Sequence, residues 1–486
     1  MDVTEDPTGF CANRAAVETE CKEHPLLFQD LGSRKVVADF SGGFLSCDGG
    51  ALLLRQVDLS MQLSRRVAAC FSDYRNQRFV EHSVPELVAQ RMIALAMGYE
   101  DLNDHNQLRL DPVIAASVGK NDPLGHDRIH PQDRGKALAG ASTLNRMELS
   151  AQKSGGNHKL PCNPEMMEDL VLQLGVEALP RDSKQIILDI DATDDPLHGS
   201  QEGAFYHGYY HNYCYLPLYI CVGDVPLWAQ LRTSDHDACE GTNQALEKIV
   251  PVLRQRCPHA EIILRGDSGF CRESILQWCE SNGLQYVIGL SRNARLEKEI
   301  EVTMIRIKER QCLCGTAVRG YKSFVYQTRD SWSRSRRVIG KAEMTLQGTN
   351  PRFVVTNLAD EIIADTVYEE YYCPRGQMEN IIKQQQLDLA ADRTSTAHMA
   401  SNQLRLWFST LAYMMLDRLR RWGLYDTLLS RATAGTVRLK LLKMAAKITV
   451  STRRVYIQFN SSFPLKDLWQ ECLNRLIQIP IHNSTG

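Results

Sequence analysis

The hydrophobic and polar positions divide the chain into a helical first third, a strand-rich middle and a helical last third. Between residues 51 and 99 the apolar residues recur near the 3.6-residue period of an amphipathic helix, and Pro85 marks a helix start. The first 35 residues are polar and irregular, and the stretches 119–137 and 151–163 have the Gly, Pro and polar composition of loops. The pattern therefore predicts a mainly helical N-terminal region with two long loops.

After Pro180 the pattern changes to short, β-branched apolar runs that alternate with amphipathic segments. The predicted strands are 185–190, 213–222, 226–231, 261–264 and 285–290, and the predicted helices are 241–256 and 272–281. Three strands followed by helix, strand, helix and strand predict a mixed sheet with flanking helices, which is an α/β architecture.

The segment 291–358 interrupts this order with apolar runs among clusters of charge, which predict a β-rich insertion. Its expected strands are 321–328, 337–339 and 353–357. From Ala364 the pattern is helical again, and residues 399–422 predict one long helix.

Composition narrows the class of protein. The chain has 486 residues, which corresponds to roughly three domains, and its hydrophobic share of 43% excludes wholesale disorder. The formal net charge of -2 excludes nucleic-acid binding through overall positive charge, but not through a local basic face. The acidic start and the absence of an 18-residue apolar run predict a soluble protein without an export signal or membrane span. Its 15 cysteines are dispersed without a CxxC pair, as in reduced cytosolic proteins.

Three carboxylates stand where the active site of an α/β protein can form. Asp191 and Asp267 each follow a predicted strand, and Glu379 lies one to two turns into a helix that can start at Pro374. Because neighbouring strands end at one edge of a sheet, a helix across that edge can add the third carboxylate. An all-oxygen ligand set suits Mg²⁺, and two such ions can activate water and stabilise the leaving oxygen in an attack on phosphorus.

Each carboxylate also has an ordinary structural interpretation. An Asp before Gly or Thr at a strand end commonly forms a turn or caps a helix, and this applies to Asp267. Spacing alone does not select Asp191 over its acidic neighbours Asp189, Asp194 and Asp195. Longer motifs are needed to choose among them.

The segments around the three carboxylates resemble one family of proteins. Residues 372–379, Tyr-Cys-Pro-Arg-Gly-Gln-Met-Glu, fit the pattern of tyrosine, two residues, arginine, three residues and glutamate in the insertion-sequence-4 superfamily of DDE transposases. Residues 189–203 are similar to the first-aspartate segment of the insertion-sequence-1380 transposases, and residues 264–270 are similar to their second. The resemblance covers residues 180–460 well and the N-terminal third more loosely.

This resemblance implies a domain organisation. A ribonuclease-H-like catalytic core is expected over residues 180–290 and 359–425, with the β-rich insertion at 291–358. A mainly α-helical DNA-binding region is expected at 1–165, and a basic C-terminal region at 426–486.

The resemblance also implies an activity. Asp191, Asp267 and Glu379 are the expected catalytic residues and ligands of two Mg²⁺ ions, which Mn²⁺ can replace. They would cleave DNA at the terminal inverted repeats of a transposon and transfer the strands into target DNA by a cut-and-paste route, with hairpin ends as one variant. A homodimer on DNA in the bacterial cytoplasm, associated with the nucleoid, is the expected assembly. A metal-dependent nuclease without strand transfer and a catalytically silent DNA-binding protein are the alternatives.

Residues near Glu379 are the expected phosphate contacts. Tyr372 and Arg375 of the motif would bind the DNA backbone, and Arg375 can hold a phosphate with two hydrogen bonds. The family has a lysine seven residues after the glutamate, where this chain has Gln386. Lys383 either supplies the missing cation or forms an ordinary surface pair with Glu379.

Basic residues elsewhere predict a wider DNA interface. Cations greatly outnumber acids between residues 405 and 454, although a solvated helix face is the alternative interpretation. The expected phosphate contacts there are Arg438, Lys440, Lys443, Arg453 and Arg454. In the insertion, Trp332 beside Arg336 and Arg337 either stacks on an unpaired base or belongs to the core.

Two further features have less specific signals. Residues 142–146 can begin a recognition helix or simply cap an ordinary one. His198 lies close enough to Asp191 in sequence to touch phosphate or water, whereas the Gly-rich, β-rich surroundings of His207 and His211 argue against a zinc site.

Overall fold

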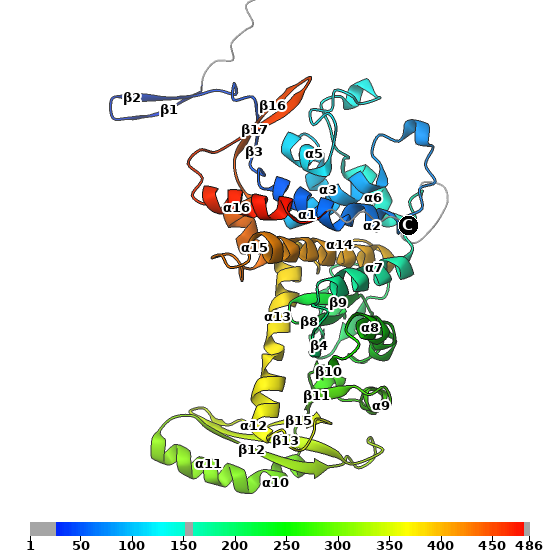
Figure 1. Cartoon of the computed structure of the whole chain (residues 1–486), viewed down its shortest axis with the longest axis vertical. Helices are drawn as coiled ribbons and strands as arrows, with labels where there is room; N and C mark the ends of the chain where they lie inside the picture. The colour runs from blue at the N-terminus through cyan, green and yellow to red at the C-terminus, as the bar shows by residue number, and fades with distance from the viewer. Residues whose placement is uncertain (1–25, 151–158, 481–486) are drawn as a thin grey trace, which may run out of the picture.

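The computed structural model describes residues 26–150 and 159–480. These residues form an elongated molecule with a helical body at one end, a central sheet, and a smaller lobe of strands and helices at the other end (Figure 1). A long helical rod runs beside the sheet and connects the lobe with the helical body (Figure 1).

The central sheet places two of the predicted carboxylates side by side. Its strands follow the order β12-β13-β15-β11-β10-β4-β8-β9, and β14 pairs with β13. The strands from the middle of the chain are β4 Gln185–Ala192, β8 Leu218–Val222, β9 Val225–Gln230, β10 Glu261–Gly266 and β11 Gln285–Leu290. β4, β10 and β11 are parallel, and Ile190 of β4 pairs with Gly266 of β10. The residues that follow this pair, Asp191 and Asp267, therefore leave the sheet at the same edge.

Alternation along the strands explains how the sheet is covered. Ile186, Leu188 and Ile190 point to one face and share a core with α8 Thr242–Arg256 and α9 Glu273–Ser281. These helices are the crossovers that parallel strands require. The predicted strands 185–190, 226–231, 261–264 and 285–290 and both predicted helices are confirmed.

One predicted strand is divided in the structure. The stretch 213–222 forms β7 Asn212–Tyr215 and β8, because Pro217 has no N–H to donate to a sheet. β7 belongs to a separate small sheet with β5 Asp195–Pro196 and β6 Phe205–His207, in the order β5-β7-β6.

The rod covers the other face of the sheet. It consists of α12 Ala364–Thr366, the π-helical η5 Val367–Tyr372, the 3₁₀ turn η6 Cys373–Arg375, α13 Gly376–Lys383 and the π-helical η7 Gln384–Asp388. The expectation that this helix starts at Pro374 is wrong. Pro374 lies inside the rod, where the neighbouring π and 3₁₀ turns accommodate a residue without an N–H.

The lobe is only partly the expected β-rich insertion. It begins with two helices, α10 Ala294–Glu299 and α11 Glu301–Cys314, before β12 Val318–Tyr326, β13 Arg336–Thr345, β14 Gly348–Thr349 and β15 Arg352–Thr356. Ile307 is the one buried residue of α11, so this helix lacks the apolar stripe that periodicity detects. β15 pairs with β11, and the strands of the lobe thus continue the central sheet.

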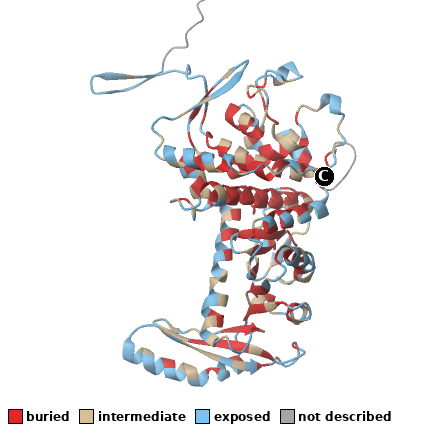
Figure 2. Ribbon diagram, viewed as in Figure 1, coloured by how far each residue is buried: buried red, intermediate tan, exposed pale blue. Residues whose placement is uncertain are grey.

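The helical body combines both ends of the described chain. Its helices are α1 Ala51–Met61, α2 Leu63–Ala68, α3 Val84–Ala96, α4 His105–Leu108, α5 Pro112–Val118, α6 Ala141–Leu149, α7 Pro164–Glu177, α14 Met399–Arg418, α15 Ala434–Val437 and α16 Lys466–Ile477. α14 is buried along almost its whole length and contacts α1, α3, α6 and α7 (Figure 2). N- and C-terminal helices therefore share one hydrophobic core.

Strands complete the body. β3 Phe44–Ser46 pairs with β16 Ala446–Ser451, which pairs with β17 Arg454–Phe459. Where irregular chain was expected, β1 Leu26–Leu31 and β2 Arg34–Ala38 form a hairpin that projects from the body (Figure 1). No helix among the described residues is both long and apolar enough to cross a bilayer.

A buried carboxylate joins the two ends of the chain inside the body. Asp48 is fully buried, and its oxygens contact Lys443 Nζ at 2.7 Å and the Tyr99 hydroxyl at 2.6 Å. Lys443, predicted to bind DNA phosphate, is thus engaged inside the protein, and its ammonium also lies 4.2 Å from the centre of the Tyr99 ring.

The Lys443→Met variant is expected to lower the free energy of unfolding by about 3 kcal/mol, because it leaves the buried Asp48 carboxylate without a cation. The matched variant Lys440→Met, at an exposed position in the same segment, should change it by less than about 0.5 kcal/mol. Urea denaturation followed by tryptophan fluorescence measures both values. Equal stabilities would show that the pair of Lys443 and Asp48 does not hold the two ends together.

Candidate active site

One cavity of about 580 Å³ lies at the sheet edge where β4 and β10 end, beside the rod. Asp191, Asp267 and Glu379 all line it. Asp191 comes from the end of β4, Asp267 from the turn after β10, and Glu379 from the first turn of α13. The structure therefore brings the three predicted catalytic carboxylates to one place.

The turn after β10 orients Asp267. Its Oδ1 accepts a hydrogen bond from the Gly269 N–H at 2.8 Å, so this residue both shapes the turn and lines the cavity. Gly289 of β11 permits close packing behind the turn, since a Cβ there would lie 2.7 Å from the Tyr372 hydroxyl. The Tyr372 hydroxyl reaches this space, and Tyr372 is not among the residues that line the cavity. Its position suits support of the turn better than the predicted contact with phosphate.

Arg375 lies between two of the carboxylates. Its Nη1 is 3.3 Å from Asp191 Oδ2, and its Nη2 is 3.6 Å from Glu379 Oε1. Burial on its own would lower the pKa of Arg375, but Asp191 and the neighbouring Tyr372, Asp267 and Glu379 raise it above its usual value. The guanidinium therefore stays charged and partly neutralises the acidic cluster.

The cluster retains an excess of negative charge. Burial, with smaller contributions from Asp267 and Glu379, raises the pKa of Asp191 to about 6 against the opposing effect of Arg375. Within the described chain, no three His, Cys, Asp or Glu side chains lie close enough together to surround one metal ion. The carboxylates thus share a cavity without yet converging on a common point.

The acidic neighbours of Asp191 have other partners. Asp189 is buried and forms a two-point ion pair with Arg265, at 2.5 and 2.7 Å. Asp194 accepts a hydrogen bond from the side chain of Asn212 at 3.0 Å. The tertiary structure thus distinguishes Asp191 from residues that spacing alone could not exclude.

Gln386 stands where the resemblance to the insertion-sequence-4 superfamily predicts a lysine, and it holds the chain that follows Asp191. Its Nε2 donates to the Asp194 carbonyl at 3.1 Å and to Asp195 Oδ1 at 3.0 Å. Lys383 is exposed and lines the cavity, while Glu379 forms its ion pair with Arg375. The positive charge at this side of the cavity therefore comes from Lys383 and not from position 386.

The expected DNA contacts of the lobe lie inside the protein. Trp332 is only 5% exposed, and the guanidinium of Arg336 lies 5.4 Å from its ring centre. Arg336 itself is held by Glu273 at 2.7 Å and by Glu280 at 2.8 Å. Arg337 donates to backbone carbonyls at the start of the rod instead of facing solvent. The core alternative for Trp332 is the one that the structure shows.

The basic segment of the C-terminal third is divided between interior and surface. Arg438 donates to the backbone carbonyls of Ala96 and Asp388, which makes it a link between α3 and the rod. Buried Asp417 pairs with three arginines, Arg418, Arg420 and Arg421. The predicted contacts that remain exposed are Lys440, Arg453 and Arg454, together with Lys447.

Sequence reasoning missed aromatic residues at the cavity. His207, Tyr209 and Tyr210 line it from the turn between β6 and β7. The dense aromatic run from Phe205 to Tyr215 was the available signal. His198, predicted near the active centre, instead lines a neighbouring cavity.

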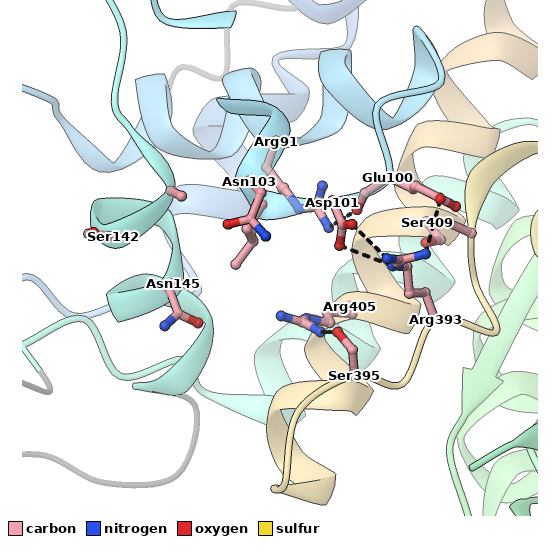
Figure 3. A pocket seen from close by; sticks show the side chains of 13 residues that line it. Arg91, Glu100, Asp101, Asn103, Ser142, Asn145, Arg393, Ser395, Arg405 and Ser409 are labelled. Atoms are coloured by element: carbon pink, nitrogen blue, oxygen red, sulfur yellow. Dashed lines mark hydrogen bonds and ion pairs between the residues drawn. The ribbon is translucent and has the colours of Figure 1, made fainter. Parts of the chain in front are cut away.

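A second polar cavity, of about 300 Å³, lies between the helical body and the chain that follows the rod (Figure 3). Glu148 of α6 is fully buried and accepts from Arg91 at 2.9 Å and from Arg405 at 2.6 Å. Arg393 pairs with Asp101 across the cavity at 2.6 Å (Figure 3). Residues 142–146, the candidate recognition helix, lie in α6 beside this junction. The pair of Arg393 with Asp101 fastens the chain after the rod to the body, while Glu148 joins α3, α6 and α14 within the body.

Comparison with known proteins identifies the family. The sequence profile described as "Transposase DDE domain group 1" matches residues 28–481. The chain belongs to this family, and it is a transposase, an enzyme of DNA transposition. No curated protein matches it. Among solved structures, a "Cryo-EM structure of piggyBac transposase synaptic complex with hairpin DNA" is similar over 90% of this chain and 86% of that chain, with a TM-score of 0.39 and 10% sequence identity.

The Asp191→Asn variant is expected to be more stable than the wild type at pH 8 in metal-free buffer. The folded-state pKa of about 6 lies above the value near 3.9 of an unfolded Asp, so the folded protein keeps a proton that the unfolded chain releases over this interval. The stability that this proton provides is lost as the pH rises through 6. Above that pH, the charged carboxylate lowers the free energy of unfolding of the wild type by about 1–3 kcal/mol.

Thermal unfolding at pH 5 and pH 8 in the presence of EDTA measures this effect. The gain in Tm of Asp191→Asn over the wild type should be larger at pH 8 than at pH 5. Asp182→Asn, which changes an exposed carboxylate outside the cavity, should show no such difference. A gain that is equal at both pH values would contradict the raised pKa.

Proposed function

We propose that this transposase cleaves DNA at the terminal inverted repeats of an insertion sequence and joins the freed 3′-ends to target DNA by a cut-and-paste route. The observation that carries the proposal is the meeting of Asp191, Asp267 and Glu379 in one cavity, with Arg375 between two of them. The motifs around these residues support an assignment to the insertion-sequence-1380 type.

The arrangement of strands supports a ribonuclease-H-like core. β9, β8 and β4 form an antiparallel group, and β10 and β11 continue from β4 in parallel. The first two catalytic carboxylates then follow the two adjacent parallel strands at its centre. Residues 291–358 would be an insertion whose strands extend the sheet beyond β11.

Two Mg²⁺ ions, or Mn²⁺ in their place, fit the site by donor type and by charge. The three carboxylates offer only oxygen ligands. Burial, and to a smaller extent Asp267 and Glu379, raises the pKa of Asp191, so a bound cation would favour the charged form of this carboxylate. Asp191, Asp267 and Glu379 would hold the ions after Arg375 turns out from between them. Bound ions would activate the attacking hydroxyl and stabilise the leaving oxygen.

The cations of the rod would bind the DNA backbone. Once it leaves Asp191 and Glu379, the planar guanidinium of Arg375 can hold a phosphate through two hydrogen bonds. Lys383 lies one turn beyond Glu379 in α13 and lines the same cavity. Gln386 keeps the chain after Asp191 in place, so Lys383 rather than residue 386 would supply the second positive charge.

Wild-type protein is expected to cut a DNA end that carries the element's inverted repeat when Mg²⁺ is present and not when EDTA is present. Asp267→Asn and Glu379→Gln should each reduce the rate by at least about a thousandfold, because each loses a carboxylate of the cavity. Asp182→Asn, outside the cavity, should cut at the wild-type rate. Denaturing gels measure the products, and a slowly migrating closed strand would reveal a hairpin.

The alternatives give different results in the same assay. Cleavage without joining to target DNA would indicate a metal-dependent nuclease and overturn the strand-transfer part of the proposal. Binding of the end without any cleavage would indicate a catalytically silent DNA-binding protein. Wild-type activity in Asp267→Asn would show that the cavity is not the active site.

The exposed cations beside the β16–β17 hairpin are the proposed contacts with DNA outside the cavity. Arg453 and Arg454 lie at the turn of this hairpin, Lys447 lies in β16 itself, and Lys440 lies in the chain leading to it. Unlike Arg438 and Lys443, these four are exposed. They form the part of the predicted basic interface that remains available to phosphate.

The double variant Arg453→Ala/Arg454→Ala is expected to bind DNA with a weaker salt dependence. The slope of log affinity against log salt should fall by about 2, since each lost phosphate contact contributes about 0.9. Lys308→Ala/Arg310→Ala, which removes two exposed cations from α11 at the far end of the molecule, should leave the slope unchanged. Fluorescence anisotropy over a range of NaCl concentrations measures it. An identical slope for both double variants would contradict the assignment.

We also propose that two copies act together in the bacterial cytoplasm, at the nucleoid, each on one DNA end. Leu27, Phe28 and Leu31 are exposed on the β1–β2 hairpin that projects from the body. A hairpin of two strands is marginally stable alone, so this apolar surface suits contact with a second copy.

A further inference from the structure

We propose that the turn between β6 and β7 is a stacking site for an unpaired nucleobase next to the scissile phosphate. The inference rests on the proposed function and adds a second element of the substrate to the phosphate. Tyr209, at the tip of this turn, is 80% exposed and lines the same cavity as the three carboxylates. An aromatic face so open to solvent, at the edge of a catalytic cavity, is available to a ligand.

The rings around Tyr209 form a platform. His207 and Tyr210 lie against each other with ring centroids 4.9 Å apart, and Tyr209 meets Tyr210 edge-on with centroids 5.0 Å apart. Among the residues that the structure describes, Tyr210 is the one ring in contact with Tyr209. A perpendicular neighbour can cover at most one face of the Tyr209 ring, so at least one face of this exposed ring is open for stacking.

The turn is rigidly connected to the catalytic strand. β7 pairs with Asp195–Pro196, four residues after Asp191, and the side chain of Asn212 donates to Asp194 at 3.0 Å. The turn itself is closed by a hydrogen bond from the His211 N–H to the His207 carbonyl at 2.9 Å, with His211 in the left-handed conformation at a φ of 56°. The distance from Tyr209 to the reacting phosphate is thus set by the fold.

The charges at this rim favour a neutral partner. Asp194 and Asp191 lie near Tyr210 and, together with burial, raise the pKa of its phenol. They would repel a phosphate placed on the same rings, whereas the flat face of a base carries no charge. Trp332 is buried against Arg336, and Phe270, which also lines the cavity, is only 1% exposed. The turn is therefore the aromatic group of the cavity that is open to stacking. Base stacking on aromatic side chains tolerates every base, which suits a site beside a cut.

The test uses DNA ends with 2-aminopurine placed in turn at each position around the cleavage site, bound to full-length protein in EDTA so that no cutting occurs. Wild-type protein should quench the fluorescence of an unpaired 2-aminopurine at one position. Tyr209→Ala should abolish this quenching and weaken binding of that end by about 5- to 100-fold. Tyr209→Phe, which keeps the ring, should behave within twofold of the wild type.

Tyr74→Ala is the matched control, because Tyr74 is 65% exposed in the helical body and lies outside the cavity. It should leave both quenching and affinity unchanged. If Tyr209→Ala quenches and binds like the wild type, the stacking site is overturned while the proposed function stands. If the wild type does not distinguish the inverted-repeat end from unrelated DNA, the proposed function and the stacking site both fail.

Discussion

The position of one arginine, held between two carboxylates, depends on how the rod is fixed at both ends. Near its start, Val367 and Tyr368 pack on the face of the central sheet. Near its end, Ile381 and Ile382 belong to the core of the helical body. Anchored in this way, the rod carries Arg375 and Glu379 across the edge where β4 and β10 end. The geometry of the cavity therefore follows from packing that lies outside it.

The same geometry makes the site a source of instability that the rest of the molecule must offset. Three carboxylates around one partly buried cavity repel each other, and the single guanidinium between them compensates only in part. The structure holds them there through the parallel pairing of β4 with β10 and through the ion pair of Asp101 with Arg393, which follows the rod. Uncompensated charge of this kind is typical of a functional site that binds a cation or a phosphate-bearing ligand.

Most of the buried cations serve the fold. Arg336 binds two glutamates, Arg438 binds backbone carbonyls of two elements, and Lys443 neutralises Asp48. Removing any of these partners would leave a buried charge uncompensated, which is more costly than losing a surface pair. A chain with nearly balanced charge can still offer a local basic face, here the exposed cations around the β16–β17 hairpin.

The sequence by itself determined β4, β9, β10, β11 and both crossover helices of the core, because apolar periodicity reports which face of a short segment is buried. It also singled out Asp191, Asp267 and Glu379, since their motifs are continuous in the chain. Only the tertiary structure decided that Trp332 is covered by Arg336, that Lys443 meets Asp48, and that the aromatic turn at Tyr209 reaches the cavity. Each of these contacts depends on how the folded chain places one segment against another. The hydrophobic periodicity of a segment shows which of its faces is buried, but not which other segment packs on that face.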